Sequence, residues 1–564
     1  MGKRVYQLRR IIAVIALSAI LCAGCGNKSA EMQPETNLQE EMSEESQGTG
    51  EQEEDLTESI SEFGAESGVE ADAESAQTAL DDEKEAEEDL EAKDSSLEMQ
   101  SFPKPWGELT EGAAPVVSIM TENKEWYAQD GETVLYEAFQ DTVTVENEGF
   151  ENLQAALAEY FLPIDEKEHE GLLQYAQEAY DDFEKENDND SQRSFYTHSC
   201  WQNAELMRSD STVVSFEEYM NAYLGRYAGA VYAGATFDVQ NGRKLKLTDI
   251  LQDEEGFYKA AVDYIMDWLT EFYRRDMQSI RDYVESAFSE EQTDNWYLNG
   301  AGIVIIYNDM TPGPGSAVKI TLPYGLFYEY IREEYTNPHT ELIAAVPEGE
   351  DIAGLLGMEQ LVEITSDETG DGFVYVAIDD MNERAGVGRF GDAYVIKRQN
   401  GRIFLVFVVL EEDVDTMCVY EITDGEIKKC DEKTEAYFDS SFWGTERIGI
   451  SLTVHALGTH TGYMDFKWDE KGKLVAAEEI YEIKAAWNLI VIKDIPVRME
   501  GVETVVKAGE QIMVTGINME ENIYYFQVVD SGECGEIYYN ESQKGRMIDG
   551  ISEFEYFENL NYAG

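Results

Sequence analysis

Basic residues are scarce in this chain of 564 residues. Lys and Arg number 41 against 116 Asp and Glu, which gives a formal net charge of −75. Binding of nucleic acid begins with Lys and Arg neutralising phosphates, so this balance excludes DNA and RNA as partners. The attraction that such a charge offers is for cations or basic proteins. Cysteine is also rare. The six cysteines are scattered and too few to form a disulfide scaffold.

Signatures of enzymes are missing as well. The chain has no G-x-S-x-G elbow and no Cys beside a His in a recognisable protease context. Residues 386–391 match G-x-G-x-x-G, but a strand is expected after them where a dinucleotide site needs a helix. Carboxylates are so abundant that no pair stands out as a glycosidase acid and nucleophile. We therefore expect a protein that is not an enzyme.

No long hydrophobic run follows the basic N-terminal leader. The apolar run over 11–21 is shorter than the roughly 20 residues of a spanning helix and suits a secretory signal. It ends in Cys22-Ala23-Gly24-Cys25, which resembles the lipobox of bacterial lipoproteins, with Cys22 where Leu is usual. The resemblance implies a signal peptide over 1–25, acylation (palmitate) of Cys25 and a lipid-anchored chain on the outer face of the bacterial cytoplasmic membrane. A plain secretory signal or an uncleaved anchor is the alternative.

The segment 26–100 is strongly acidic. It holds 26 acidic residues against Lys28, Lys84 and Lys93, and its bulky apolar residues are isolated. Such a segment cannot bury enough apolar area to offset the entropy of ordering. We expect a disordered linker that holds the rest of the chain away from the membrane, with a partner-binding acidic tail as the alternative.

Residues 101–337 show the periodicities of an α+β domain. Short strands are expected near 116–119, 133–136 and 142–145, and a second group of strands runs over 204–247. Apolar residues at helical spacing over 257–273 form one stripe, which must lie on a sheet. The simplest packing is an antiparallel sheet with its helices on one side.

Several segments of this domain resemble a known family. Val214-Ser215-Phe216, Thr236-Phe237-Asp238-Val239 and the run 242–250 follow the order seen in the extracellular domain of RsiV-like proteins, as do 296–305 and 312–323. The resemblance covers about 115–335 and implies an extracellular recognition or sensing domain. A component of the cell wall or a basic protein is the implied ligand.

Four tyrosines of this domain are the candidate ligand contacts. Aromatic side chains on the expected sheet offer large contact areas when they are exposed. The candidates are Tyr227, Tyr232, Tyr307 and Tyr324.

Beyond residue 338 the pattern is of strands alone. We expect an all-β meander over 338–485, in which Thr423-Asp424-Gly425 closes a hairpin. Cys418 and Cys430 are equidistant from Asp424, so a three-residue loop would place them opposite each other. They would then form a disulfide or remain as two buried thiols.

Residues 486–564 form a separate unit of short strands. The segments 495–497, 506–510 and 525–528 resemble those of bacterial SH3-like domains. The resemblance implies a small SH3-like β-barrel and the binding of wall peptides.

One acidic turn is a candidate cation site. Asp367, Thr369 and Asp371 resemble the opening of a calcium loop, since clustered oxygens suit a hard cation. The alternatives are a loose Ca²⁺-binding turn and a solvated turn, and no other cofactor is expected.

Together these observations predict a non-enzymatic lipoprotein of the cell envelope. It would bind or sense an extracellular ligand or an envelope component. An enzyme that hydrolyses or modifies cell-wall polymers and a passive structural module of the envelope are the alternatives.

Overall fold

The computed structural model describes most of the chain between Gly112 and Tyr562. The described ranges are 112–187, 194–225, 227–272, 277–288, 295–308, 317–338, 340–366, 372–379, 381–411, 414–423, 426–484, 486–542, 545–558 and 560–562. The leader, the acidic linker and the residues of the candidate calcium turn lie outside these ranges. None of the helices within them combines the length and apolar character needed to cross a membrane.

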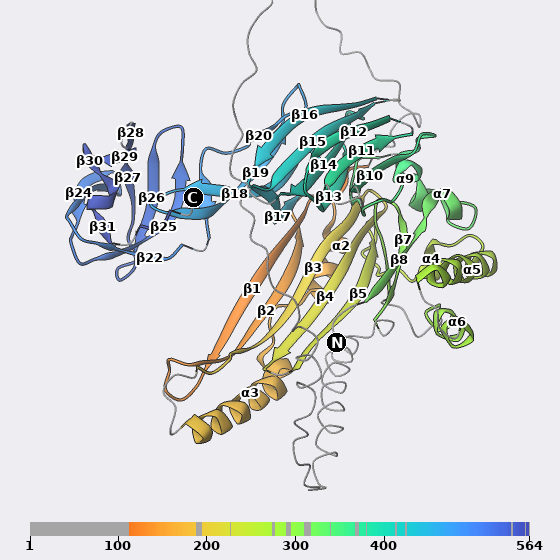
Figure 1. The fold of residues 1–564 in the computed structure, drawn as a ribbon, viewed down its shortest axis with the longest axis horizontal. Coiled ribbons are helices and arrows are strands. Elements are labelled where there is room, and N and C mark those ends of the chain that lie inside the picture. The colour runs from red at the N-terminus through yellow and green to blue at the C-terminus, as the bar shows by residue number, and fades with distance from the viewer. Residues whose placement is uncertain are drawn as a thin grey trace, which may run out of the picture. The chain divides into compact units, whose positions relative to one another are not determined.

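Five strands lie side by side at the start of the described chain (Figure 1). They are β1 (Val117–Tyr127), β2 (Val134–Val145), β3 (His198–Asp210), β4 (Val213–Leu224) and β5 (Tyr227–Asp238). Neighbours pair antiparallel except β2 and β3, which run parallel. Parallel neighbours need a long crossover connection, and this one contains α2 (Glu151–Tyr160) and α3 (Glu166–Asn187).

The two crossover helices lie against one face of this sheet. The ring of Phe161, which directly follows α2, meets Phe216 of β4 edge-on with 5.1 Å between ring centroids. Helix α3 buries Leu172 and Ala176 in one hydrophobic cluster with Tyr136 of β2. Because side chains alternate along a strand, the even-numbered residues of β4 form this helix-covered face.

The opposite face of β4 and β5 is partly covered by a small sheet. Its strands are β6 (Trp296–Leu298), β7 (Gly302–Tyr307) and β8 (Val318–Pro323). The Leu298 amide donates to Ser215 Oγ over 2.9 Å. A Cβ at Gly234 would lie 1.9 Å from the Trp296 carbonyl oxygen, so this close approach requires glycine.

Helix α5 (Glu254–Phe272) confirms the helix predicted from the apolar stripe. It buries Phe257, Ile265 and Leu269 in one cluster with the β6–β8 sheet, whose other face contacts the large sheet. Helices therefore lie on both sides of the β1–β5 sheet, and the expectation of helices on one side alone is wrong. The other helices are short: α4 (Leu247–Ile250), α6 (Met277–Ser286), α7 (Tyr324–Phe327), α8 (Glu333–Thr336) and α9 (Ala353–Leu356).

The all-β part continues the first sheet instead of standing beside it. Strand β9 (Leu342–Ala345) pairs with both β3 and β13 (Arg389–Lys397), so that Lys397 and Asp210 both lie opposite Leu342. The strands that follow are β14 (Ile403–Leu410), β15 (Thr416–Thr423), β16 (Glu426–Thr434), β17 (Ala436–Trp443), β18 (Arg447–His455), β19 (Thr459–Trp468), β20 (Leu474–Ala476) and β21 (Tyr481–Ile483). A separate small sheet contains β10 (Val362–Ser366), β11 (Phe373–Ile378) and β12 (Met381–Val387).

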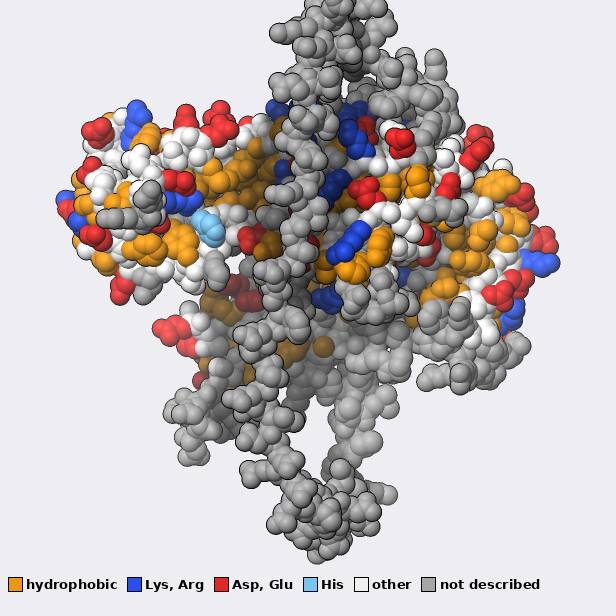
Figure 2. Space-filling view, turned by 45° about the horizontal axis from the view of Figure 1, so that its top comes forward, with side chains coloured by type: hydrophobic (Ala, Val, Ile, Leu, Met, Phe, Trp, Pro, Cys, Tyr) orange, Lys and Arg blue, Asp and Glu red, His pale blue; other side chains and the backbone are white. Residues whose placement is uncertain are grey.

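The C-terminal strands form an open sheet in the part of the chain that the structure describes. The members of this unit are β22 (Asn488–Val491), β23 (Ile495–Met499), β24 (Val502–Val506), β25 (Gln511–Asn518), β26 (Ile523–Val528), β27 (Cys534–Tyr538), β28 (Asn540–Ser542), β29 (Gly545–Ile548), β30 (Ile551–Ser552) and β31 (Phe557–Glu558). Strands β28–β30 pair only with one another and form a separate sheet, and β25 also pairs with β21. The other pairings run β24–β23–β27–β26–β25–β22–β31 and leave β24 and β31 as edges, so they do not close into the expected barrel. Figure 2 shows hydrophobic patches between acidic side chains over these strands, at the left.

The chain is thus α+β, with mostly strands and few helices around a large antiparallel sheet. Apolar strands such as β14, whose seven residues from Ile403 to Val409 are all buried, supply the continuous core. This core fixes the position of the β1–β5 sheet, one end of which is free of covering strands.

Candidate functional site

Two of the four tyrosines predicted as ligand contacts belong to the core. Tyr307 is 2% exposed and Tyr324 is 1% exposed. Tyr307 lies on β7, which is buried on both faces, and the Tyr324 hydroxyl accepts a 2.7 Å hydrogen bond from Arg208 Nη1. The prediction for both residues is therefore wrong. The side chain of Tyr227 lies outside the described part of the chain, as do Cys25, Asp367, Thr369 and Asp371.

Of the two alternatives for Cys418 and Cys430, a disulfide and two buried thiols, the disulfide does not form; Cys418 is buried and Cys430 is half-buried. Both thiols are free. Thr423 pairs with Glu426, so two residues instead of three connect the strands, and a bulge after Val419 shifts the register further. Cys418 consequently lies opposite Glu432 in the main core, while Cys430 packs on the other face of the sheet.

Tyr232, the fourth predicted contact, lies on a partly exposed surface of aromatic side chains. Register places it with four other residues on the face of the β2–β5 sheet that is opposite to α2 and α3. Phe139 pairs with Trp201 and Tyr219 pairs with Tyr232, while Tyr223 lies two residues beyond Asn221, the partner of Trp201. We call Phe139, Trp201, Tyr219, Tyr223 and Tyr232 the aromatic face.

The rings of the aromatic face are arranged in pairs. Phe139 and Trp201 stack with ring centroids 3.7 Å apart and planes 9° from parallel. Tyr219 and Tyr232 lie 4.8 Å apart with tilted planes. Trp201 keeps 37% and Tyr223 39% of its surface exposed, and the other three rings are half-buried. Stacked neighbours fix the rings in place, so the surface is formed before any ligand arrives.

Polar side chains stand between the rings. Asn203 and Glu205 follow Trp201 on the same face of β3, and Asn221 lies between Tyr219 and Tyr223 on β4. Asn203 and Glu205 are exposed, and Asn221 is half-buried. The amides both donate and accept hydrogen bonds, while carboxylates accept. The surface therefore combines ring faces with hydrogen-bonding groups at short intervals.

Carboxyl groups gather where the aromatic face meets β8 and β13. Glu205 lies directly opposite Glu217 across β3 and β4. Glu217 is buried and forms an ion pair with Lys319, whose Nζ also lies 4.2 Å from the centre of the Tyr232 ring. Lys319 is thereby held at the border of the aromatic face.

The pKa of Glu205 is raised to about 7. The main cause is desolvation by crowded protein atoms, and the carboxylates of Glu217 and Asp392 add to it. The Tyr394 hydroxyl donates to Glu205 Oε1 over 3.5 Å. Part of the Glu205 side chain nevertheless reaches solvent, so the group is accessible to a ligand.

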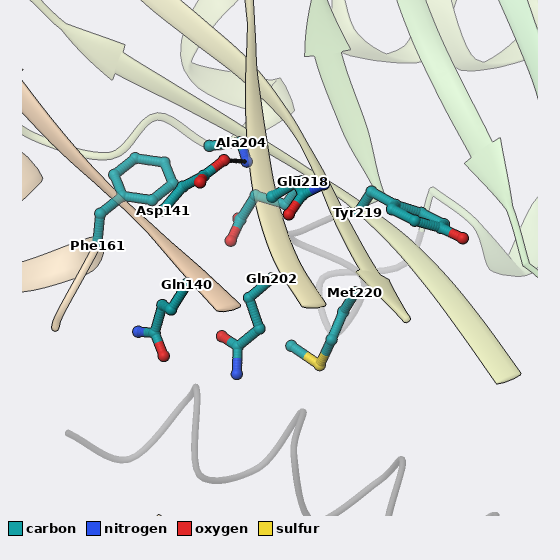
Figure 3. A pocket seen from close by; sticks show the side chains of 9 residues that line it. Gln140, Asp141, Phe161, Gln202, Ala204, Glu218, Tyr219 and Met220 are labelled. Carbon is teal, nitrogen blue, oxygen red and sulfur yellow. Dashed lines mark hydrogen bonds between the residues drawn. The ribbon is translucent and has the colours of Figure 1, made fainter. Parts of the chain in front are cut away.

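A hollow also opens on the helix-covered face of the same strands (Figure 3). Its lining includes Gln140, Gln202, Glu218 and Met220, with Phe161 beside them. Its volume of about 20 Å³ is room for about one water molecule. This hollow is too small for an organic ligand.

The described ranges contain no preformed metal site. No group of three or more His, Cys, Asp or Glu side chains comes together there in a way that could hold a metal ion. The carboxyl groups around Glu205 are engaged instead by Lys319 and Tyr394.

Sequence reasoning missed Phe139, Trp201, Tyr219 and Tyr223. The alternation of Trp201, Asn203 and Glu205 with buried neighbours was the available signal for β3. The stack of Phe139 on Trp201 was not visible, because it depends on a parallel pair formed across two helices.

Comparisons with known proteins find similarity only to solved structures. About two fifths of the chain matches crystal structures of DUF3298 family proteins. A protein from Bacteroides fragilis is 16% identical, with a TM-score of 0.30 over 39% of this chain and 95% of that one. A protein from Pseudomonas aeruginosa is 15% identical, with a TM-score of 0.28 over 41% and 97%. No family model and no curated protein matches the chain.

Proposed function

We propose that this chain is a non-enzymatic lipoprotein on the outer face of the bacterial cytoplasmic membrane that binds an extracellular ligand on the aromatic face. The observation that carries the proposal is the partly exposed cluster of five rings on β2–β5. Clusters of exposed aromatic side chains mark binding sites more often than chance, because leaving them in water is unfavourable. The lipobox-like Cys25 supports the anchor.

The fold gives the aromatic face two properties of a recognition surface. The face rests on paired strands instead of loops, so its side chains are held by the sheet. The cover from β6–β8 reaches from Ser215 to Tyr232, whose backbone is hydrogen-bonded to Asn308, and it leaves Trp201 and Tyr223 more than a third exposed. A passive structural module has no need for such rings at its surface.

A hydrolytic or modifying enzyme is the second candidate, and one observation favours it. The raised pKa of Glu205 beside Glu217 and Asp392 is the kind of environment in which a carboxyl group works as a general acid. Glycoside hydrolysis needs a second carboxylate that reaches the same substrate. Glu217 is buried and paired with Lys319, which argues against that role.

The C-terminal strands are a candidate second binding module, because their sequence resembles SH3-like domains. Exposed apolar residues lie on this unit, among them Ile492 at 50% and Val502 at 66% exposure. We propose that it assists attachment to the cell wall, as SH3-like domains that bind wall peptides do.

The anchor is tested with labelled palmitate. Label should enter the full chain, and Cys25→Ala should abolish both the labelling and the retention of the protein in the membrane fraction. Unlabelled protein that stays on membranes after the substitution would remove the lipoprotein proposal.

Binding is tested with the full chain carrying Cys25→Ala, so that the lipid does not contribute. Retention on purified bacterial envelopes should be saturable, and Trp201→Ala should abolish it. Tyr437→Ala is the matched control, since this tyrosine of β17 is 40% exposed and lies outside both the aromatic face and the C-terminal unit. Retention that both variants leave unchanged would contradict a role for the aromatic face. Release of soluble wall fragments that Glu205→Gln abolishes would instead support the enzyme.

A further inference from the structure

The size of the aromatic face limits what it can bind. The four strands β2–β5 lie about 4.8 Å apart, and the six residue steps from Ser199 to Glu205 each rise about 3.4 Å. The face therefore measures about 15 by 20 Å, or roughly 300 Å². A stable protein partner covers about 800 Å² on each side, so the face suits a smaller, extended ligand.

Charge on the aromatic face disfavours an anionic ligand. Between its rings lie Asn203, Glu205 and Asn221, and Glu137 lies beside Phe139 on β2. Lys319, a basic side chain at the border of the face, is already paired with Glu217 and placed over Tyr232. A phosphate or uronate would meet these carboxylates, and among the described residues that form or border the face the only ammonium group placed beside them, Lys319, is already paired.

The partial protonation of Glu205 makes a strongly cationic ligand less suitable for this face. A carboxyl group whose pKa lies near neutrality is in part protonated at physiological pH, and it then donates as well as accepts hydrogen bonds. In that state it resembles the neighbouring amides of Asn203 and Asn221 more than a fixed negative charge. The polar groups of the face thus match hydroxyl groups, which also donate and accept.

The rings complete the match to a sugar. The face of an aromatic ring carries negative charge density and attracts C–H groups that point towards it. A hexose presents such C–H groups on its flat sides and hydroxyl groups around its rim. The Phe139–Trp201 and Tyr219–Tyr232 pairs offer two ring platforms. Asn203 lies between them, because it follows Trp201 on the same face of β3 and pairs with Tyr219 across to β4.

We propose that the aromatic face binds an uncharged oligosaccharide, with its sugar rings on Trp201, Tyr219 and Tyr223 and its hydroxyl groups on Asn203, Glu205 and Asn221. This inference rests on the proposed function, and it names the ligand class of the same site. An oligosaccharide of a few sugar rings matches the extent of the face, which is why tetrasaccharides are the probes.

The test is a titration of the full chain carrying Cys25→Ala with cellotetraose, chitotetraose and maltotetraose by calorimetry. At least one of these uncharged tetrasaccharides should bind saturably below about 1 mM. Trp201→Ala and Tyr223→Ala should each weaken binding about tenfold or more. Trp201→Phe should retain most of it, and Tyr437→Ala should change nothing.

Three results would overturn the inference. The first is an absence of binding to all three sugars while retention on envelopes still depends on Trp201, which leaves the proposed function intact. The second is binding that Trp201→Ala and Tyr223→Ala both leave unchanged. The third is binding of tetralysine alone, weakened by added salt, which assigns the face to a cationic ligand. Loss of both sugar binding and Trp201-dependent retention would instead refute the proposed function itself.

Discussion

Phe139 and Trp201 stack face to face across the parallel β2–β3 pair, with 3.7 Å between their ring centroids. The pair exists because the crossover through α2 and α3 returns the chain beside β2. One ring of the pair keeps more than a third of its surface exposed, at 37% for Trp201. The stack is therefore a platform at the surface more than a part of the core.

Trp201→Ala should cost little stability. An exposed ring leaves no cavity when it is removed, and the lost stacking is worth about 0.5–1.5 kcal/mol. Urea unfolding followed by far-ultraviolet circular dichroism measures the loss, with Trp487→Ala as the comparison, because Trp487 is 39% exposed and stacks on the ring of His460. A loss above about 3 kcal/mol would show that Trp201 acts as a core residue, and binding defects of the variant would then say nothing about a site.

The helices could be predicted where the signal is local. The apolar stripe of α5 depends only on residues three and four positions apart, which the sequence displays directly. The pairing of the strands could not be predicted in this way, because β9 pairs with β3 and with β13, which are distant in the sequence. Two expected domains were therefore found to share one sheet.

In the candidate site, too, local features could be predicted from the sequence and features set by long-range packing could not. The pattern of β7 marks Tyr307 as a strand residue, but only the placement of α5 on one face and the large sheet on the other makes it buried. Cys418 and Cys430 fail as a pair because the loop has two residues instead of three and a bulged residue then shifts the register of β16 further. A bulge of one residue carries no clear sequence signal here.

Asp210→Asn should destabilise the protein strongly. Asp210 and Arg208 are both fully buried, and Arg208 Nε donates to Asp210 Oδ2 over 2.7 Å. The other carboxylate oxygen accepts from the amides of Thr212 and Val213. Removing one charge leaves the other uncompensated in the core, which costs about 3–5 kcal/mol. The midpoint of urea unfolding reports the change.

The exposed pair of Lys185 and Asp182 is the control for that experiment. Both side chains are about three-quarters exposed. Asp182→Asn should leave the unfolding midpoint unchanged within error, because solvent screens such pairs. Equal effects of the two substitutions would contradict the burial of Asp210.

Cysteine reactivity should follow burial in the described part of the chain. Burial raises the pKa of Cys200 and of Cys418 to about 11, so neither forms much thiolate at pH 8. Cys534 is exposed. Iodoacetamide should label Cys534 in the native protein and reach Cys200 and Cys418 only in denaturant, as peptide mass spectrometry can show. A disulfide-linked peptide joining Cys418 to Cys430 in oxidised protein would contradict the free thiols.

Acidification below about pH 6.5 should loosen α3 from its sheet. His169 of α3 and His198 of β3 are 2% and 3% exposed, and desolvation lowers the pKa of each. His169 contacts the Tyr136 hydroxyl at 2.8 Å and the Trp126 ring, with Asp165 and Lys124 as the charged groups near it. His198 lies against the rings of Tyr175 and Phe195. Burial is the main cause of the lowered pKa of His169; Lys124 lowers this pKa further, and Asp165 raises it.

The direction of this pH dependence follows from proton uptake. Below pH 6.5 the unfolded chain protonates both histidines while the folded chain resists, so stability falls as the pH falls. His169→Gln keeps an acceptor for Tyr136 and should flatten the slope of unfolding free energy against pH between 7.5 and 5. His455→Gln, at an exposed histidine, should leave the slope unchanged. Carboxyl groups with raised pKa values, such as Glu205 and Asp392, act in the opposite direction, so the difference between variant and parent is the quantity to measure. A parent slope that His169→Gln does not alter would show that this histidine does not control the docking of α3.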